Sequence, residues 1–456
     1  MNILHYSLGF PPYRTGGMTK YCLDLISEQL KLGHKVSMIW PGRIKKYGYE
    51  CNIKENREYD LGKDLMCKSY EIINPLPVPL LDGIKDIDAF TQSKDEFIFY
   101  TFLKENNIQV IHIHTLMGLP KECITAAKSL GIKVIYTTHD YFGICPKWGL
   151  MHEGKICEND DECKKCVNCN KTALSLNKIK ILQSNLYRNV KNTKIVKQLR
   201  KKHNDSLYED STKVSSIEMN NAKEDKNDYK KYQELRKFYI NILKQMDIIH
   251  FNSNNTQKIY QNYFSTNENE KVLSITHSSI SDNRKIKTYN GNLNLGYLGP
   301  ITEHKGFYSL KRVCDVLHNQ CKGEFKLHIF ANYEGKEEYI VKHNPYKYDE
   351  LDKVMDSIDI LIVPSLWNET FGFTVLEALS YGVPVIASKY VGAKDILENG
   401  KSGMIYEDLE ELKDTLEDII TNQEKKLSKM NKYINESVNI KEISIHAKEI
   451  EKLYLG

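Results

Sequence analysis

The stretch PSLWNETFGFTVLEALSYGVPVIAS, residues 364–388, contains a loop, a short helix and a following strand. The run DILIVPS (359–365) leads into the loop and is apolar throughout, which is typical of a strand buried on both faces of a parallel sheet. The segment 373–381 has helical apolar spacing, and Gly382 ends it with Pro384 just beyond. The stretch therefore predicts a strand–loop–helix–strand unit.

The same alternation extends upstream of this stretch. NLGYLG (294–299) and KLHIFA (326–331) are two more apolar runs of strand length. Strands that alternate with helices favour a parallel sheet covered on both faces, in which ligands bind at the carboxyl ends of the strands. We therefore predict a Rossmann-like domain over residues 284–432.

The first half of the chain repeats the pattern. Ile3–Tyr6 is a short strand, PPYRTGGM (11–18) a glycine loop, Tyr21–Leu32 a helix, and KVSMIW (35–40) the next strand. Further candidate elements are the strand 110–114, a helix over 120–130, the strand 133–138 and the strand DIIHFNS (247–253). We predict a second Rossmann-like domain over residues 1–283, so that the α/β chain has two such domains facing each other across a cleft.

Two segments do not belong to these alternating patterns. Residues 145–169 are rich in cysteine, and about 170–246 form a basic insertion with helical apolar spacing, which includes a solvated part near 205–227. The polar linker 281–292 separates the two halves, and the last segment, 433–456, is a helix that we expect to pack back on the N-terminal domain.

The two glutamates of the opening stretch, Glu369 and Glu377, differ in their local structure. Glu369 lies in the loop at the end of a strand, and Glu377 lies inside the following helix. A helix amino-terminus next to a glycine suits a phosphate, because it presents N–H groups and a partial positive charge. Carboxylates near a phosphate site are suited to bind hydroxyls instead. Two carboxylates at this spacing therefore fit the ribose and hexose diols of a nucleotide-sugar.

The motif Glu369-x7-Glu377 resembles that of the retaining GT-B glycosyltransferases, the large family that includes bacterial hexosyltransferases and sucrose synthases. YLGPITEHKGF (297–307), the Gly16-Gly17 pair and His139-Asp140 support the resemblance. It covers the C-terminal domain closely and most of the N-terminal domain loosely, but not the basic insertion. It implies transfer of a hexose from a UDP- or GDP-sugar to a saccharide or lipid-linked acceptor in bacterial-type surface polysaccharide or glycolipid synthesis.

The resemblance also implies roles for single residues. Glu369 would bind the donor hexose, Glu377 the ribose, and Lys305 would neutralise the leaving diphosphate, so that Glu369, Lys305 and His139 form the expected catalytic set. The expected donor-binding set is Gly16, Gly17, Lys305, Phe371, Gly372, Phe373, Thr374 and Glu377. One departure stands out, because many relatives have an arginine where this chain has Pro300.

Four residues of the N-terminal domain are candidates as well. Gly16-Gly17 lets backbone approach the donor closely, although an ordinary turn is an equal alternative. His139 at a strand end would face the reacting carbon or the acceptor, with a structural hydrogen bond as the alternative. Arg14 is a candidate for binding an anionic acceptor, with a solvated loop arginine as the more common alternative. The Asp86-Ile87-Asp88 triplet is interpreted as chance, and no cofactor is expected for catalysis.

Four closely spaced cysteines suggest a structural metal site. Cys157, Cys163, Cys166 and Cys169 form a C-x5-C-x2-C-x2-C pattern, with Cys145 just upstream. Such thiolates suit zinc or an iron–sulfur cluster, and free thiols are the alternative.

Composition limits the remaining classes. The 456 residues include 27% charged and 41% hydrophobic residues, 64 basic against 60 acidic, with no run near the roughly 20 apolar residues that span a bilayer. The start has no secretory signal pattern, so we expect a cytoplasmic protein, and peripheral contact of the basic insertion with an anionic membrane stays open. A nucleotide-sugar epimerase or hydrolase is the rival enzyme. A nucleic-acid-binding module is the rival from another class, disfavoured by the order of the motifs, and we expect no nucleic-acid partner.

Overall fold

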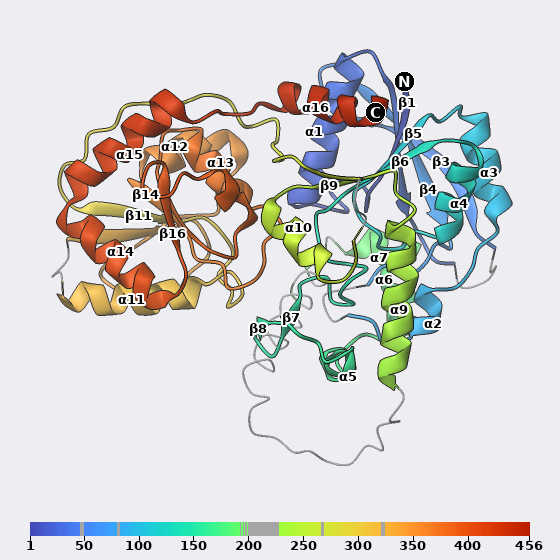
Figure 1. The fold of residues 1–456 in the computed structure, drawn as a ribbon, viewed down its shortest axis with the longest axis horizontal. Coiled ribbons are helices and arrows are strands. Elements are labelled where there is room, and N and C mark those ends of the chain that lie inside the picture. Colours follow the sequence, from blue (N-terminus) through green and yellow to red (C-terminus); the bar gives the residue numbers. More distant parts are fainter. Residues whose placement is uncertain are drawn as a thin grey trace. The chain divides into compact units, whose positions relative to one another are not determined.

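The computed structural model describes residues 1–45, 50–79, 83–191, 193–194, 196, 198, 228–265, 269–320 and 324–456 (Figure 1). The chain divides into two compact units. The N-terminal unit comprises Met1–His250, Tyr260–Lys271 and Ile450–Gly456, and the C-terminal unit comprises Phe251–Ile259 and Val272–Glu449. The solvated segment predicted near 205–227 lies outside the described residues.

The N-terminal unit is built on an eight-stranded sheet of order β10-β9-β6-β5-β1-β2-β4-β3. Its strands are β1 Asn2–Tyr6, β2 Lys35–Pro41, β3 Asn52–Asp60, β4 Met66–Ile73, β5 Val110–Ile113, β6 Lys133–Thr137, β9 Ile248–Phe251 and β10 Glu270–Val272. The central pairs, from β9 through β6, β5 and β1 to β2 and β4, are parallel, and β3 is antiparallel to β4. The predicted parallel α/β core is thereby confirmed, and the β3–β4 hairpin at its edge is an addition.

Helices of the N-terminal unit connect these strands. They are α1 Gly17–Lys31, α2 Ile87–Phe90, α3 Glu96–Glu105, α4 Lys121–Ser129, α5 Lys164–Cys169, α6 Leu176–Leu182, α7 Asn185–Val190 and α9 Asp228–Leu243, with a small hairpin of β7 Met151–His152 and β8 Lys155–Ile156. Helix α10 Asn254–Gln261 belongs to the C-terminal unit up to Ile259 and to the N-terminal unit after it. Helix α9 comes from the end of the predicted basic insertion, yet Tyr239 and Leu243 on it are fully buried. Its apolar face therefore belongs to the core of the unit.

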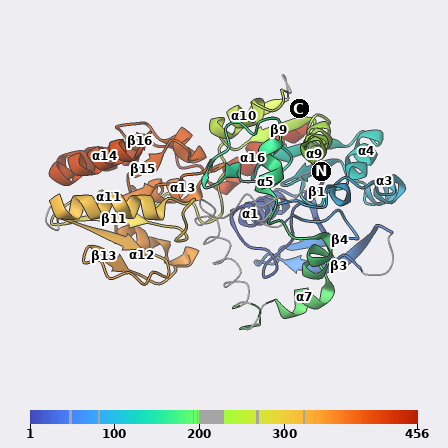
Figure 2. The same ribbon diagram turned by 90° about the horizontal axis from the view of Figure 1, so that it is seen from below.

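The C-terminal unit has a six-stranded sheet of order β13-β12-β11-β14-β15-β16 in which every pair is parallel. The strands are β11 Leu293–Tyr297, β12 Phe325–Ile329, β13 Ile340–Lys342, β14 Ile360–Val363, β15 Val385–Ser388 and β16 Gly403–Tyr406. The helices are α11 Phe307–Gln320, α12 Leu351–Asp356, α13 Phe373–Leu379, α14 Leu409–Thr421, α15 Gln423–Ser437 and α16 Ile443–Leu455, with 3₁₀ turns at Tyr348–Glu350 and Gly392–Ile396. Helices α11 and α14 lie side by side on this sheet (Figure 2).

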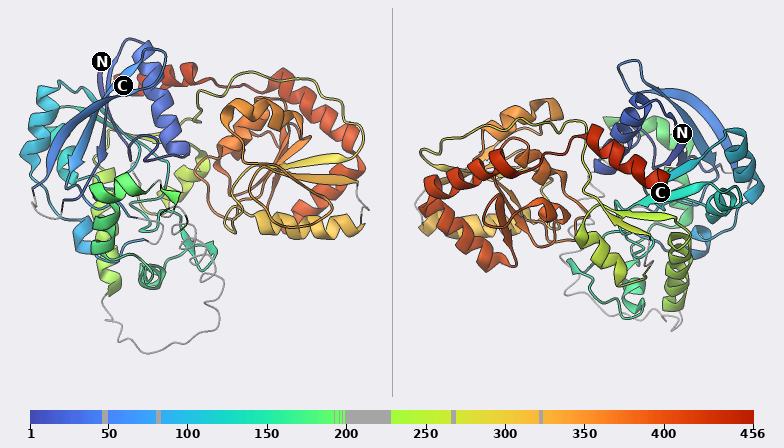
Figure 3. Two further views of the ribbon diagram at one scale, coloured as in Figure 1. Left: turned by 180° about the vertical axis from the view of Figure 1, so that it is seen from behind. Right: turned by 45° about the horizontal axis from the view of Figure 1, so that its top comes forward.

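Both chain ends lie close together in the N-terminal unit, because the last turns of α16 pack there (Figure 3). Tyr454 of α16 is almost fully buried and its hydroxyl contacts Gln29 of α1 and His112 of β5. Among the described residues, no helix is both long and apolar enough to cross a membrane.

Candidate active site

The loop between β14 and α13 carries the first candidate residue, Glu369. Gly372 ends the loop in a left-handed conformation, with φ of 101°, and α13 begins directly after it. A side chain at this position would meet Val391 at 3.0 Å and a carboxylate oxygen of Glu369 at 3.2 Å. Glycine is therefore required both by the backbone conformation and by the close approach of Glu369.

Glu369 is buried and forms an ion pair with Lys305. Its Oε1 accepts a hydrogen bond from Lys305 Nζ at 2.9 Å and another from the Ser365 hydroxyl. Burial alone would raise the pKa of Glu369, but Lys305 and these hydrogen bonds outweigh it and hold the pKa below its usual value. Lys305 also lies over the Trp367 ring, 5.2 Å from its centroid. The two residues predicted to bind different parts of a donor thus contact each other.

The pairing of Lys305 with Glu369 follows from the sheet order. β11 and β14 are neighbouring parallel strands, so the loops after them meet at one edge of the sheet. Gly306, with φ of 74°, brings the first loop against the second, because a Cβ there would lie 1.7 Å from the carbonyl oxygen of Pro364. The Leu366 amide also donates to the His304 carbonyl at 2.9 Å.

The backbone of Glu369 is fixed on its other side as well. Its amide donates to the Tyr390 carbonyl, and its carbonyl accepts from the Gly392 amide, each at 3.0 Å. The neighbouring Thr370 carbonyl accepts from the Ser253 hydroxyl at 2.7 Å. Glu369 therefore sits on a loop held in place by both flanking segments, which is the support that a binding carboxylate needs.

Glu377 lies in the second turn of α13 and is only 2% exposed. Its Oε1 accepts a hydrogen bond from His277 Nε2 at 3.0 Å, and the Ser279 amide donates to His277 Nδ1, which fixes the tautomer. The second oxygen, Oε2, is buried and has no hydrogen-bond partner within the described part of the chain. Sequence reasoning missed His277, which lies 100 positions away from Glu377 without any local motif.

The remaining donor-binding candidates of this unit surround the two glutamates. Phe371 and Phe373 pack edge to face, with ring centroids 5.5 Å apart, and Phe373 packs in the same way against His277 at 5.0 Å. Thr374 is the second residue of α13, where backbone N–H groups have no partner inside the helix. At the departure from the family pattern, the Pro300 carbonyl accepts the Tyr297 hydroxyl at 2.6 Å.

Gly16, Gly17 and His139 all belong to the N-terminal unit. Gly16, with φ of 119°, precedes α1, and a Cβ built there has open space around it. Tyr21 of the same helix lies 4.9 Å from the His139 ring, centroid to centroid. His139 follows β6, and burial raises the pKa of the adjacent Asp140 to about 6 against hydrogen bonds from the Phe142 amide and the Thr115 hydroxyl.

His139 is the end of a chain of buried hydrogen bonds. Its Nε2 lies 3.3 Å from His114 Nδ1, His114 Nε2 lies 2.9 Å from His5 Nδ1, and His5 Nε2 lies 2.7 Å from Gln29 Oε1. Gln29 donates to Tyr454, whose hydroxyl lies 2.7 Å from His112 Nδ1. The chain continues from His112 through Thr137 to His250 at 2.6 and 2.9 Å.

The Gln29 amide sets the direction of this chain. Because its NH₂ group donates to Tyr454, its oxygen accepts from His5, so His5 carries its proton on Nε2. Burial lowers the pKa of His5 to about 4 and the pKa of His114 well below its usual value, so both rings are neutral at pH 7. His114 must then donate to His5 and accept from His139, which makes Nδ1 the acceptor nitrogen of His139.

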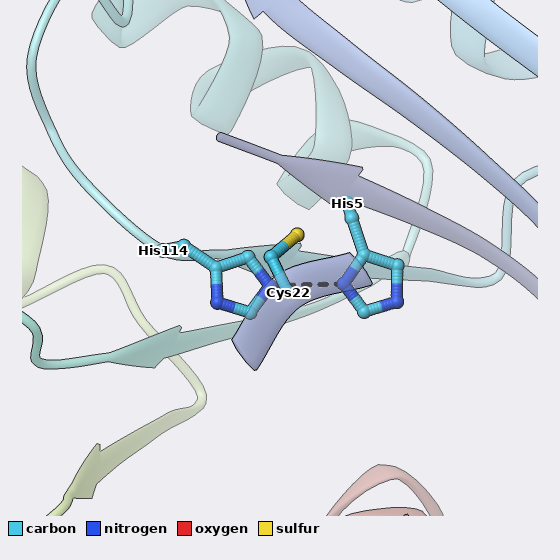
Figure 4. A group of neighbouring side chains, drawn as sticks. All are labelled: His5, Cys22 and His114. Carbon is cyan, nitrogen blue, oxygen red and sulfur yellow. Dashed lines mark hydrogen bonds between the residues drawn. The ribbon is translucent and has the colours of Figure 1, made fainter. Parts of the chain in front are cut away.

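His5, Cys22 and His114 lie close enough to suggest a metal site (Figure 4). Each neutral imidazole has one lone pair, and those of His5 and His114 accept the hydrogen bonds of the chain just described. We therefore assign this cluster to the hydrogen-bonded chain. The alternating histidines of VIHIH, which share one face of β5, were its sequence signal.

The cysteine-rich segment folds around a small cavity in the N-terminal unit. Cys145, Cys157, Cys166 and Cys169 line it, together with Arg236 of α9. Of the predicted ligands, Cys163 and Cys166 lie close together with Asp160, their ligand atoms within 4.8 Å of one another. Arg236 pairs with Asp160 and lies 3.9 Å from the Cys166 sulfur. The other two predicted ligands, Cys157 and Cys169, line the cavity with Cys145 but are not part of this close group.

Two Rossmann-like units, each with polar side chains at the carboxyl ends of its parallel strands, define the GT-B class of fold. Solved structures of this class match the whole chain. Anabaena Alr3699/HepE in complex with UDP has a TM-score of 0.56 at 12% identity and covers 99% of both chains. The lipopolysaccharide outer core galactosyltransferase WaaB in its apo form also has a TM-score of 0.56, at 15% identity over 100% of this chain and 99% of that chain.

Family models match both units. Residues 280–437 match "Glycosyl transferases group 1", and residues 15–157 match "Glycosyltransferase Family 4". The chain therefore belongs to the glycosyltransferases of group 1. A 41.2 kDa protein in the cps region of Klebsiella pneumoniae is 30% identical over 158 residues, 34% of this chain and 42% of that protein. The chain spans less than half the length of the first curated relatives it matches.

Proposed function

We propose that the chain is a retaining glycosyltransferase that moves a hexose from a UDP- or GDP-sugar to an acceptor in surface polysaccharide or glycolipid synthesis. One observation carries the donor assignment. The buried Oε2 of Glu377 has no partner among the described residues, while Oε1 is held by His277. A buried acceptor without a donor costs about 1–3 kcal/mol, and a ribose hydroxyl would remove that cost.

The ion pair between Lys305 and Glu369 suggests how the two residues share the donor. A diphosphate attracts the Lys305 ammonium more strongly than one carboxylate does, because the diphosphate carries more negative charge. When a donor binds, Lys305 would turn to the diphosphate and leave Glu369 Oε1 for a hexose hydroxyl. Charge on the diphosphate grows as the glycosidic bond breaks, so Lys305 would contribute most in the transition state.

In the N-terminal unit, His139 is the group that we assign to the acceptor. The assignment rests on its place directly after β6, at the edge of the sheet where the parallel strands end. A Cβ built on Gly16 has open space around it, which leaves room for a ligand close to the backbone there. The leaving diphosphate would assist deprotonation of the acceptor, and the protein would contribute positioning and charge stabilisation.

The relatives support a nucleotide-sugar donor and a role in surface saccharides. Anabaena Alr3699/HepE binds UDP and, in a further structure, UDP-glucose. The WaaB protein is a galactosyltransferase of the lipopolysaccharide outer core, and two Klebsiella pneumoniae relatives are proteins in the cps region.

A panel of UDP- and GDP-sugars tests the proposal. The purified protein should slowly hydrolyse one donor, with release of the nucleoside diphosphate, and proton NMR should show that the freed hexose keeps its anomeric configuration. Glu377→Gln is the matched control, since it keeps the side-chain size and should weaken the donor. A protein that consumes no nucleotide-sugar refutes the proposal, and full turnover without any acceptor would favour the epimerase or hydrolase alternative.

We propose that Cys163 and Cys166, whose ligand atoms lie within 4.8 Å of each other and of Asp160, hold a structural metal ion. Cys157 and Cys169 line the cavity that Asp160 and Cys166 also line. Thiolates are the ligands that zinc prefers in closed sites, and the Arg236 guanidinium beside Cys166 would offset part of their negative charge. A metal there would hold β7, β8 and α5 against α9. We also propose that the basic segment, residues 170–246, contacts an anionic membrane. Part of this segment lies outside the described residues.

A further inference from the structure

A deep groove in the N-terminal unit has no role in the proposal so far. It has a volume of about 800 Å³ and lies where β1 and β2 end, between the loop after β1 and helices α6 and α7. Its walls include Phe10, Tyr13, Trp40, Tyr59 and Tyr187. Grooves of this size, lined by aromatic rings with a few polar groups, are typical of small-molecule sites.

The charge of the groove is strongly positive. Within the described part of the chain, the groove is lined by four basic side chains and a single carboxylate, which are Arg14, Arg57, Arg188, Lys191 and Glu58. Arg188 has a partner, because its guanidinium donates to the buried Glu71 at 3.2 Å. That carboxylate is shared, since Arg43 also binds it at 2.7 Å. One carboxylate for two guanidinium groups leaves positive charge in this region.

Arg14 is the residue that points to a ligand. Its guanidinium has no hydrogen-bond or ion-pair partner within the described part of the chain, although its backbone amide donates to Phe10 at 2.9 Å. Burial and the nearby Arg188 both lower the pKa of Arg14. Arg14 is partly exposed, and an unpartnered cation beside a second cation still costs free energy in the isolated protein. An anion in the groove would remove that cost.

The aromatic side chains supply a surface for a sugar ring. Phe10 stacks on Tyr59 with centroids 3.9 Å apart and meets Trp40 edge to face at 5.2 Å, which fixes the rings. Tyr13 is 44% exposed and lies 5.1 Å from the Arg188 guanidinium. An apolar sugar face can therefore pack on a ring while an anionic group reaches the arginines.

We propose that this groove binds an anionic saccharide, with Arg14 and Arg188 holding its phosphate or another anionic group, as the acceptor of the transfer. The assignment as acceptor rests on the proposed function, whereas anion binding by the groove does not. A phosphate carried by a free sugar and one that links a sugar to a lipid share this chemistry.

Titration calorimetry with hexose 1-phosphates and the matching uncharged methyl hexosides tests the groove without any donor. The phosphates should bind at least about tenfold more tightly, because hydrogen bonds between charged groups are the stronger ones. Arg14→Gln should weaken the phosphates by about 10- to 100-fold and leave the methyl hexosides unchanged. Arg312→Gln, on α11 of the other unit, removes the same charge as a control and should change neither affinity.

Stability separates ligand binding from a structural role for Arg14. Arg14→Gln should raise or preserve the melting temperature, since it removes the repulsion by Arg188, whereas loss of a structural contact would lower it. Equal affinity for charged and uncharged sugars, or phosphate binding that survives Arg14→Gln, would overturn the proposal. If the protein binds the phosphates but consumes no nucleotide-sugar, the groove is an anion-binding site and only the proposed transferase activity is refuted.

The source of the anion is distinguished by one further comparison. The same titration is run with a hexose 1-phosphate and with a polyprenyl phosphosugar in detergent micelles, each against the micelles alone. Tighter binding of the lipid-linked form assigns a lipid-linked acceptor, and equal binding assigns a free one. Either result supports an anionic saccharide as the ligand of the groove. If neither the hexose 1-phosphate nor the lipid-linked form binds, the proposal is overturned.

Discussion

Replacing Lys305 with methionine should destabilise the C-terminal unit and change the titration of Glu369. The two charges lie 2.9 Å apart, which corresponds to about 6 kcal/mol at an effective dielectric constant of roughly 20. Desolvation offsets part of this, and removal of one partner of a buried pair costs about 3–5 kcal/mol. Glu369 is the more buried partner, with 10% of its side chain exposed against 25% for Lys305, so the stranded carboxylate dominates the cost.

We therefore expect a loss of about 3 kcal/mol for Lys305→Met and a smaller loss for Glu369→Gln, since the exposed lysine can be solvated. The C-terminal unit has about 190 residues, for which each kcal/mol lowers the melting temperature by about 2–4 °C, so Lys305→Met should lower it by about 6–12 °C. Calorimetric unfolding of the two single variants and of the double variant Lys305→Met/Glu369→Gln measures the coupling free energy between the two side chains. The double variant should recover about half of the loss.

The pH dependence gives an independent check. Because the folded-state pKa of Glu369 lies below its ordinary value of 4.5, the carboxylate contributes stability above pH 4.5 and loses it as the pH falls through the folded pKa. Without Lys305 the folded pKa should rise, so the loss of stability that Glu369 causes on acidification should shrink, and it should become a gain if the folded pKa passes 4.5. If Lys305→Met unfolds at the wild-type temperature with an unchanged acid limb, the pair contributes nothing and the reasoning fails. Turnover should fall by about 10²-fold or more in the same variant if Lys305 binds the leaving group.

Three further predictions concern the other candidate groups. Glu377→Gln should weaken the binding of bare UDP or GDP by about tenfold or more in calorimetry. Glu369→Gln should lower kcat and leave the affinity for bare UDP or GDP nearly unchanged. If both variants weakened this affinity equally, the assignment of one carboxylate to each sugar would be contradicted. His5→Leu should change the ring ¹⁵N shifts of His139, because His114 then loses the group that fixes its tautomer, while His250→Leu should not; an unchanged spectrum would refute the direction of the chain. Protein purified without chelator should contain about one zinc, or iron with visible absorbance, and a metal-free protein that is folded and active would rule this out.

The parallel strands and most helices could be predicted, because continuous apolar runs and helical spacing are local signals. Helix α1 begins at Gly17, four residues before the predicted start, since Gly16 can precede a helix in a conformation that other residues avoid. The β3 segment NIKENREYD was missed because it has no apolar alternation. Its charged residues suit the exposed edge of a sheet, which is a property of its place in the sheet and not of a local pattern.

The candidate residues were predictable one by one, but their partners were not. Glu369 and Lys305 were chosen as separate ligands, and only the neighbouring order of β11 and β14 brings them into contact. His277 contacts Glu377 across 100 positions of sequence, and Gln29 meets Tyr454 across 425. A sequence pattern records spacing within one element, so contacts of this range need the fold.

The contact between Gln29 and Tyr454 also bears on how the protein is made. During synthesis at about 5–20 residues per second, 425 residues separate the emergence of the two partners by about 20–85 s. For that time the nascent first sheet has Gln29 and His112 in its interior without the phenol that joins them. A chaperone that protects unfinished chains would therefore meet this unit in an open state, and a ribosome stalled before Tyr454 would hold it there.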